Sequence, residues 1–178
     1  LDVDGLEYSK EKILRILQTV QVLAQKYDAV VTNPPYMNKF EPTLKKFIQK
    51  NYKDYGKDLF SVFIYNNINM TVDGGYAGYM TPFVWMFIKS YEELRKYVIS
   101  NKRISSVIQL EYSAFEEATV PIGTFVLQNI KSDTAGFYIK LSNCKGGRDV
   151  QREKVLEAMN IADSNDIYRT NKTNFSKI

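Results

Sequence analysis

Hydrophobic and polar positions along the chain alternate in blocks that predict an α/β fold. From Ser9 to Lys26, apolar side chains recur at helical spacing with charges on the other face, which predicts an amphipathic helix. A second helical pattern covers 58–70, with Asp58 placed to cap its amino end. Further helices are predicted from about Ser90 and over 149–160. Short apolar runs of strand length lie between them, at 29–32, 76–80, 104–110, 124–130 and 136–141. The segment 164–178 is rich in Asn, Lys and Thr, which predicts a loosely structured end.

The run 29–32 is the strand around which the other elements are organised. Its two consecutive β-branched valines favour a strand buried on both faces of a parallel sheet. The strand ends in the tetrapeptide Asn-Pro-Pro-Tyr at 33–36. Pro34 and Pro35 have no amide donor for a sheet ladder, so the backbone must leave the sheet there. Open α/β sheets bind ligands at the carboxyl ends of their strands, which makes this corner the candidate site.

Asn-Pro-Pro-Tyr can be an ordinary turn, since these residues punctuate many loops. The tetrapeptide also matches the catalytic motif of amino-methyltransferases that use S-adenosylmethionine. With the segments NPPYM, TPFVWM and SYEELR, the chain resembles large bacterial adenine-specific DNA methyltransferases of restriction-modification or phage-exclusion (BREX-type) systems, from about Tyr27 to Ile130. The resemblance implies a partial Rossmann-like sheet, mostly parallel with an antiparallel final strand, and helices on both faces.

The resemblance assigns catalysis to residues Asn33, Pro34, Pro35 and Tyr36. The Asn33 side-chain oxygen and the Pro34 carbonyl would accept the amino hydrogens of adenine, so that the nitrogen lone pair turns toward the methyl donor. Tyr36 would stack on a base turned out of the duplex. Such catalysis by positioning needs no covalent enzyme intermediate. Methylation at a cytosine carbon would require a cysteine nucleophile, and Cys144 lies far along the chain in a Gly/Lys-rich turn.

Four other positions take roles in the resembled family. Leu59 and Phe63 correspond to an apolar wall around the cofactor's adenine, although helical spacing equally predicts core packing for them. Phe115 corresponds to a second aromatic residue against the extruded base, or it plugs the core from a loop. Asp4 occupies the place of a carboxylate that contacts the cofactor's adenosyl part, or it is a solvated residue near a chain end.

A basic amphipathic stretch follows the tetrapeptide. Two interpretations stay open: a surface that contacts DNA phosphates, or a solvated helix face. The lysines concerned are Lys39, Lys45, Lys46, Lys50 and Lys53.

Composition narrows the classes of function. The formal net charge of +4 is mild and permits nucleic acid as a partner without requiring it. A single cysteine and no histidine favour a reducing compartment and argue against a zinc site or a histidine general base. No apolar run approaches the roughly 18 residues of a membrane span. We therefore expect a cytoplasmic protein without metal or membrane. Its 178 residues suit a single domain with its core at 27–130 and a peripheral extension at 131–178.

The resemblance leaves out two parts of such enzymes. No glycine-rich turn for the methionine end of the cofactor precedes Asn33, and no target-recognition domain follows. The chain begins with Leu1, and we expect it to be the carboxyl half of a catalytic domain, inactive in isolation, with weak or absent binding of S-adenosylmethionine. Double-stranded DNA, and restriction or phage-defence subunits, are then partners of the full-length protein. The open alternatives are amino-methyl transfer to RNA or to a protein glutamine, and a non-catalytic interaction module.

Overall fold

The computed structural model describes residues 3–112, 120–160 and 167–170. Its strands form one six-stranded sheet in the order β1-β2-β4-β3-β5-β6. The strands are β1 Tyr27–Thr32, β2 Thr71–Pro82, β3 Arg103–Gln109, β4 Ile122–Gln128, β5 Gly136–Lys140 and β6 Ile167–Thr170. The α-helices are α1 Val3–Ala24, α2 Pro42–Asn51, α3 Leu59–Asn69, α4 Glu92–Asn101 and α5 Gly147–Asn160. Two short 3-10 helices, Phe83–Met86 and Lys89–Tyr91, join β2 to α4.

Most strands of this sheet run in one direction. β1 is parallel to β2, and β3 is parallel to β5, while β4 lies antiparallel between β2 and β3. β6 is antiparallel to β5. The predicted α/β architecture is confirmed, and the sheet is mixed: β1–β2 and β3–β5 are parallel neighbours, whereas β2–β4, β4–β3 and β5–β6 are antiparallel. The last strand predicted from the sequence, 136–141, corresponds to β5 and is parallel to β3, and the antiparallel strand at that end of the sheet is β6. The motif strand β1 lies at an edge of the sheet.

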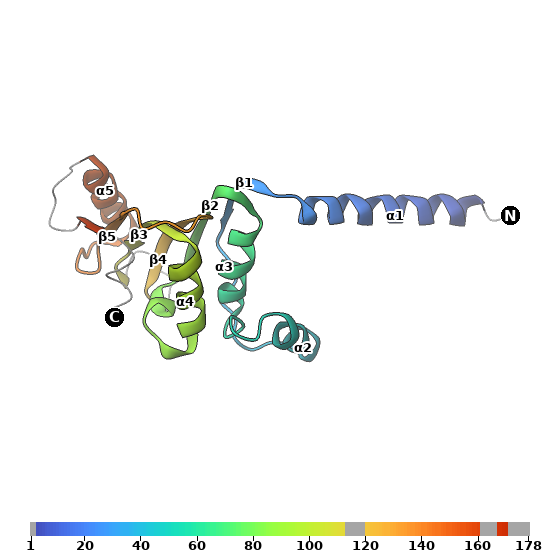
Figure 1. Ribbon diagram of the computed structural model, residues 1–178, viewed down its shortest axis with the longest axis horizontal. Helices are drawn as coiled ribbons and strands as arrows, with labels where there is room; N and C mark the ends of the chain where they lie inside the picture. Colours follow the sequence, from blue (N-terminus) through green and yellow to red (C-terminus); the bar gives the residue numbers. More distant parts are fainter. Residues whose placement is uncertain (1–2, 113–119, 161–166, 171–178) are drawn as a thin grey trace.

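Helices cover both faces of the sheet, as predicted (Figure 1). On one face, α3 and α4 pack over β2, β3 and β4 around Phe60, Ile64 and Leu94, which are almost fully buried. On the opposite face, α5 packs its Ala158 near Ile139 of β5. Helices therefore pack against both faces of the sheet, and the residue of the motif that contacts one of them is Tyr36, whose ring meets Phe60 of α3.

The prediction that the motif strand is buried on both faces is wrong. Side chains alternate along a strand. Val30 pairs with Ala77 on the side of α3 and is half-buried, whereas Val31 pairs with Gly78 on the other side and is 82% exposed. α5 lies at the β5 side of the sheet, so no described helix covers that side of β1. Two adjacent valines therefore do not establish two covered faces.

Two other segments differ from the predictions. The segment 164–178, expected to be loosely structured, contributes β6, which pairs with β5. The first helix begins earlier than predicted, at Val3, and extends away from the sheet with Leu17 and Leu23 exposed (Figure 1). Within the described part of the chain, no helix has the length and apolarity needed to cross a membrane.

Candidate active site

The motif residues lie where β1 leaves the sheet. Pro34 is buried and fixes the direction of the backbone, while Asn33, Pro35 and Tyr36 are exposed. The Tyr36 hydroxyl donates a hydrogen bond to Asn33 Oδ1 at 3.1 Å and lies 3.3 Å from the carbonyl oxygen of Met80 on β2. Burial raises the pKa of Tyr36, so its hydroxyl keeps the proton that it donates. This bond orients the Asn33 side chain with its oxygen held in place.

An aromatic residue of α3 supports Tyr36 from below. The ring of Phe60 meets the Tyr36 ring edge to face, with centroids 6.3 Å apart and planes at 83°. Phe60 is 1% exposed and also packs against Tyr91, 5.5 Å away. Tyr36 remains 42% exposed, so its ring is braced by the core while part of its surface stays open to a flat ligand. The sequence pattern singled out Leu59 and Phe63 of this helix and missed Phe60.

Asp58 connects the segment after the motif to the start of α3. Its carboxylate accepts the backbone N–H of Met37 at 3.0 Å and that of Phe60 at 3.3 Å, and Ser61 completes a capping box. The backbone N–H of Leu59 donates to the Met37 carbonyl at 2.8 Å. The predicted helix cap is confirmed. Its second role, holding the residue that follows Tyr36, depends on tertiary structure and has no local sequence signal.

We expect replacement of Asp58 by alanine to lower the free energy of unfolding. The change removes the cap and leaves the N–H groups of Met37 and Phe60 without their acceptor, and loss of such a cap costs about 1 kcal/mol. Asp58→Asn keeps one acceptor oxygen and should cost less. Urea unfolding of the chain, followed by circular dichroism, measures both changes. Equal stability of wild type and Asp58→Ala would contradict the role of the carboxylate.

The pH dependence of the same measurement provides a control. Burial raises the pKa of the Asp58 carboxyl above its ordinary value, although the backbone N–H groups of Phe60 and Met37 oppose the shift. The native chain therefore holds this proton more tightly than the unfolded chain. The free energy of unfolding should fall as pH rises from the ordinary carboxyl pKa through the raised one. Asp58→Asn should lack this contribution to the slope.

The remaining predicted residues have different outcomes. Leu59 and Phe63 are both half-buried and lie one turn apart on α3. Asp4 lies near the start of α1, which extends away from the sheet (Figure 1). At 1.5 Å per residue it is about 30 Å along the helix from the start of β1, so this structure does not bring Asp4 to the motif. Phe115 lies outside the described residues.

The sequence model of the Eco57I restriction-modification methylase family matches residues 5–115. The chain belongs to this family. The matched residues of this chain include most of α1, the motif at the end of β1, the Asp58 cap of α3 and the connection from α4 to β3.

Named relatives share more of the chain. The adenine-specific methyltransferase BrxX of Escherichia coli O9:H4 (strain HS) is 33% identical over 143 residues, which cover 78% of this chain and 12% of BrxX. The adenine-specific methyltransferase PglX of Lacticaseibacillus casei (strain Zhang) is 33% identical over 173 residues, 94% of this chain and 14% of PglX. The chain therefore spans less than a sixth of either relative.

A solved structure shows the same fold. The methyltransferase subunit of a type I restriction-modification system from Streptococcus thermophilus superposes with a TM-score of 0.66 at 19% identity. The superposition covers 86% of this chain and 36% of that one. The six-stranded sheet of this chain thus belongs to a Rossmann-like fold.

The described residues fit S-adenosylmethionine only in part. Leu59 and Phe63 offer apolar surface on one side of α3. A strand-to-helix turn with glycines of positive φ, Gly146 and Gly147, does occur, between β5 and α5. β5 is four strand positions from β1, about 19 Å at the usual spacing, so this turn lies far from Asn33. No group of three or more potential metal ligands occurs among the described side chains.

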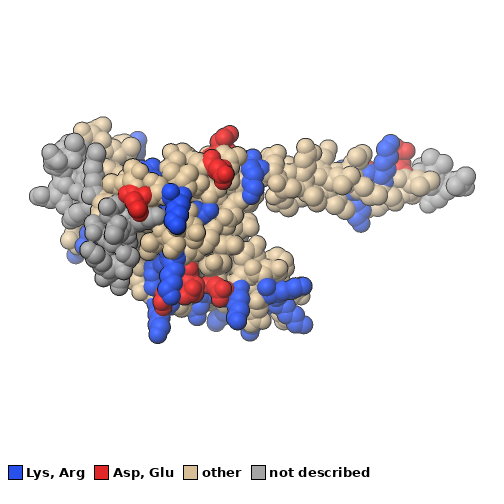
Figure 2. Space-filling model, in the orientation of Figure 1, with Lys and Arg blue, Asp and Glu red and all other residues tan. Residues whose placement is uncertain are grey.

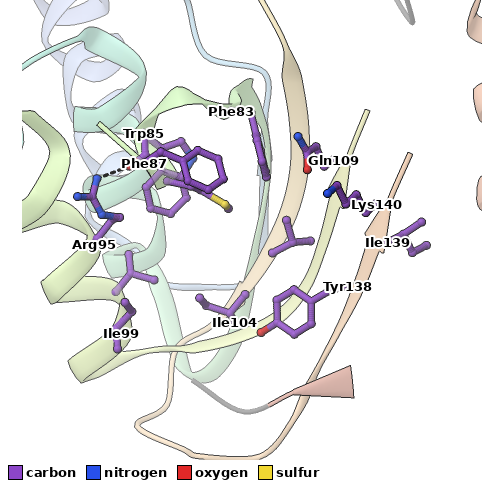
Figure 3. Close-up of a pocket in the computed structure, with 13 residues that line it drawn as sticks. Phe83, Trp85, Phe87, Arg95, Ile99, Ile104, Gln109, Tyr138, Ile139 and Lys140 are labelled. Carbon is purple, nitrogen blue, oxygen red and sulfur yellow. Dashed lines mark hydrogen bonds between the residues drawn. The ribbon is translucent and has the colours of Figure 1, made fainter. Parts of the chain in front are cut away.

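An apolar cavity of about 280 Å³ lies between α4, β3 and β5 (Figure 3). Phe83, Trp85 and Phe87 face Tyr138 across it, and Arg95 donates to the Trp85 carbonyl at 2.8 Å. None of the residues of the Asn-Pro-Pro-Tyr motif lines this cavity. It is therefore separate from the candidate active site.

Proposed function

We propose that this chain is the amino-group-binding part of an adenine-specific DNA methyltransferase that transfers a methyl group from S-adenosylmethionine to an extruded adenine. The observation that carries the proposal is the hydrogen bond from Tyr36 to Asn33 Oδ1 at the end of β1. It combines an oriented acceptor with an exposed aromatic surface at the carboxyl end of a strand. The family and the names of its relatives BrxX and PglX support the same reaction.

The residues perform this reaction by positioning. An amide oxygen has two lone pairs, and the Tyr36 hydroxyl uses one of those on Asn33 Oδ1, which leaves the other for an amino hydrogen of the base. The Pro34 carbonyl accepts the second amino hydrogen, held in place because Pro34 is buried. The nitrogen lone pair is then freed from the ring. S-adenosylmethionine, when bound, supplies the methyl group. Pro35 keeps the backbone rigid between the acceptors and Tyr36.

The proposal includes the surroundings of the full-length protein. Double-stranded DNA is its substrate, and restriction or phage-defence subunits are its partners. A cytoplasmic location is part of the same proposal, supported by the one cysteine, Cys144, which is unpaired.

The test is methyl transfer by the full-length protein to duplex DNA, with the methylated nucleoside identified after digestion. Methyladenine is the expected product, and its loss on Asn33→Ala links the reaction to the motif. Transfer to RNA or to a protein glutamine instead of DNA would overturn the assignment.

We also expect the 178-residue chain alone to bind S-adenosylmethionine weakly. Leu59 and Phe63 offer about 100 Å² of apolar area to the adenine ring, or about 2.5 kcal/mol at 25 cal/mol per Å². Loss of rigid-body freedom on binding costs at least about 4 kcal/mol. Calorimetric titration measures the affinity. Saturation at micromolar S-adenosylmethionine would show that the chain holds the methionine end of the cofactor as well.

A further inference from the structure

The positive charge of the chain is concentrated beside the motif. The segment 37–57 contains six lysines and two carboxylates, Glu41 and Asp54, so it carries a net charge of +4. The formal net charge of the whole chain is also +4, which leaves all other residues together neutral. A mild overall charge thus hides one strongly basic segment, which we call the α2 segment.

The α2 segment is held against the active site at both ends. Met37, directly after Tyr36, is bound to Asp58 and Leu59, which begin α3. The middle of the segment is also fixed: Ile48 of α2 is buried, and the ring of Tyr52 packs edge-on to Tyr65 of α3, 6.1 Å away. The segment thus forms a loop whose two ends meet at the start of α3 and whose middle packs on α3. Its outer surface therefore has a fixed place relative to Asn33 and Tyr36.

The outer surface of α2 presents unneutralised cations. Lys45, Lys46 and Lys50 are exposed, and in the described part of the chain no ion pair involves them; the ion pairs there lie within α1, α4 and α5. Glu41 forms no ion pair with these lysines. Its carboxylate accepts the backbone N–H groups of Thr43 and Leu44 and caps the amino end of α2.

These cations share their surface with an exposed aromatic ring. Lys46 and Lys50 lie one turn apart, and Phe47 between them is 53% exposed. Figure 2 shows Lys and Arg side chains gathered along the edge of the molecule formed by α2 and the amino end of α4, with a few carboxylates among them. Like charges one turn apart on a helix repel one another, so cations without a carboxylate partner do not stabilise the fold. A cluster of such cations is the electrostatic footprint of a site that binds a polyanion.

We propose that the α2 segment binds the sugar–phosphate backbone of double-stranded DNA beside the extruded adenine, with Lys45, Lys46 and Lys50 as phosphate contacts. The inference rests on the proposed function, since it assigns the surface that holds the duplex while Asn33 and Tyr36 hold the base. The sequence left two interpretations of these lysines open. Lys45, Lys46 and Lys50 take part in none of the ion pairs of the described residues, and α2 has a fixed place, so phosphate contact is favoured.

The test compares two triple variants of the full-length protein that lose the same charge. Lys45→Ala/Lys46→Ala/Lys50→Ala removes the proposed contacts. Lys10→Ala/Lys12→Ala/Lys131→Ala removes three exposed lysines elsewhere. Binding to a short duplex of random sequence is followed by fluorescence anisotropy between about 50 and 200 mM salt.

The α2 variant should show a salt dependence of log K that is smaller by about 2.7, since each phosphate contact contributes about 0.9. Over this fourfold range of salt, the wild type then loses about 40-fold more affinity than the variant. The control variant should keep the slope of the wild type. Lys45→Arg/Lys46→Arg/Lys50→Arg keeps the three positive charges and should also keep this slope. Such a result would show that the smaller slope of the alanine variant comes from the lost charges and not from misfolding of α2.

The outcomes that contradict the role of α2 differ from those that contradict the proposed function. Equal losses in the α2 and control variants, or no change in either, would overturn the assignment of α2. Tighter binding to RNA of equal length would overturn the choice of DNA as partner. If the full-length protein methylates adenine in DNA while the α2 variant binds DNA like the wild type, this inference fails and the proposed function stands. If DNA is not methylated, the proposed function fails whatever α2 binds.

Discussion

Asn33→Ala should lower kcat for methyl transfer to DNA by about 10²–10³-fold in the full-length protein, the usual cost of removing one hydrogen bond to a reacting group, about 2.7–4 kcal/mol. The variant loses the acceptor for an amino hydrogen, and the Tyr36 hydroxyl keeps only the Met80 carbonyl oxygen as an acceptor within reach. Because this acceptor works while the nitrogen changes geometry, the loss should fall mainly on kcat and less on the KM for DNA. Steady-state kinetics with a duplex that contains the target site measures both.

Further substitutions at Asn33 and Tyr36 separate the roles of the two side chains. Asn33→Asp keeps an acceptor for the Tyr36 hydroxyl but brings a negative charge beside the methyl donor and should also be impaired. Tyr36→Phe keeps the stacking ring and removes only the hydroxyl that orients Asn33, so it should lose less activity than Tyr36→Ala, which loses the ring as well. Undiminished methylation of adenine by Asn33→Ala would remove the motif from the chemistry.

The sequence predicted the elements of the fold but not the direction of every strand. Apolar runs of strand length located β1, β3 and β4. The sequence did not predict that β4 lies between β2 and β3 and runs antiparallel to both. A run such as 122–128 has the same hydrophobic pattern whichever way the strand runs. Burial of Val31 was misjudged for a related reason. A pair of β-branched residues shows that a strand is favoured, not which faces are covered.

The site was predicted to the level of the motif and no further. Asn33 and Tyr36 are three residues apart, so a local bond between them depends on the turn that the two prolines impose. Phe60 was overlooked because helical periodicity marks it as one core residue among several. Its contact with Tyr36 arises only when α3 packs under the end of β1, which no local pattern encodes. The basic character of 37–57 was visible, but its link to the motif through Asp58 was not.

Phe60 should be the position where core stability and active-site geometry depend on the same side chain. Phe60→Ala removes a ring that is 1% exposed and contacts both Tyr36 and Tyr91. Truncation of a buried phenylalanine costs about 3–5 kcal/mol, so the midpoint of urea unfolding of the chain should fall steeply. That is a large fraction of the total stability of an ordinary domain, about 5–15 kcal/mol.

Phe63→Ala is the matched control for this prediction, because it makes the same change three residues later in the same helix. Phe63 is half-buried and is not part of the core around Phe60, so its loss should cost clearly less. Phe60→Leu, which keeps most of the apolar volume, should cost under about 1.5 kcal/mol and leave the chain folded. It removes the edge-to-face contact with Tyr36, so in the full-length protein it should weaken methyl transfer although the fold survives. If Phe60→Ala and Phe63→Ala destabilise the chain equally, or if Phe60→Leu methylates DNA like the wild type, Phe60 is an ordinary core residue, and Tyr36 is held by its hydroxyl contacts with Asn33 and Met80.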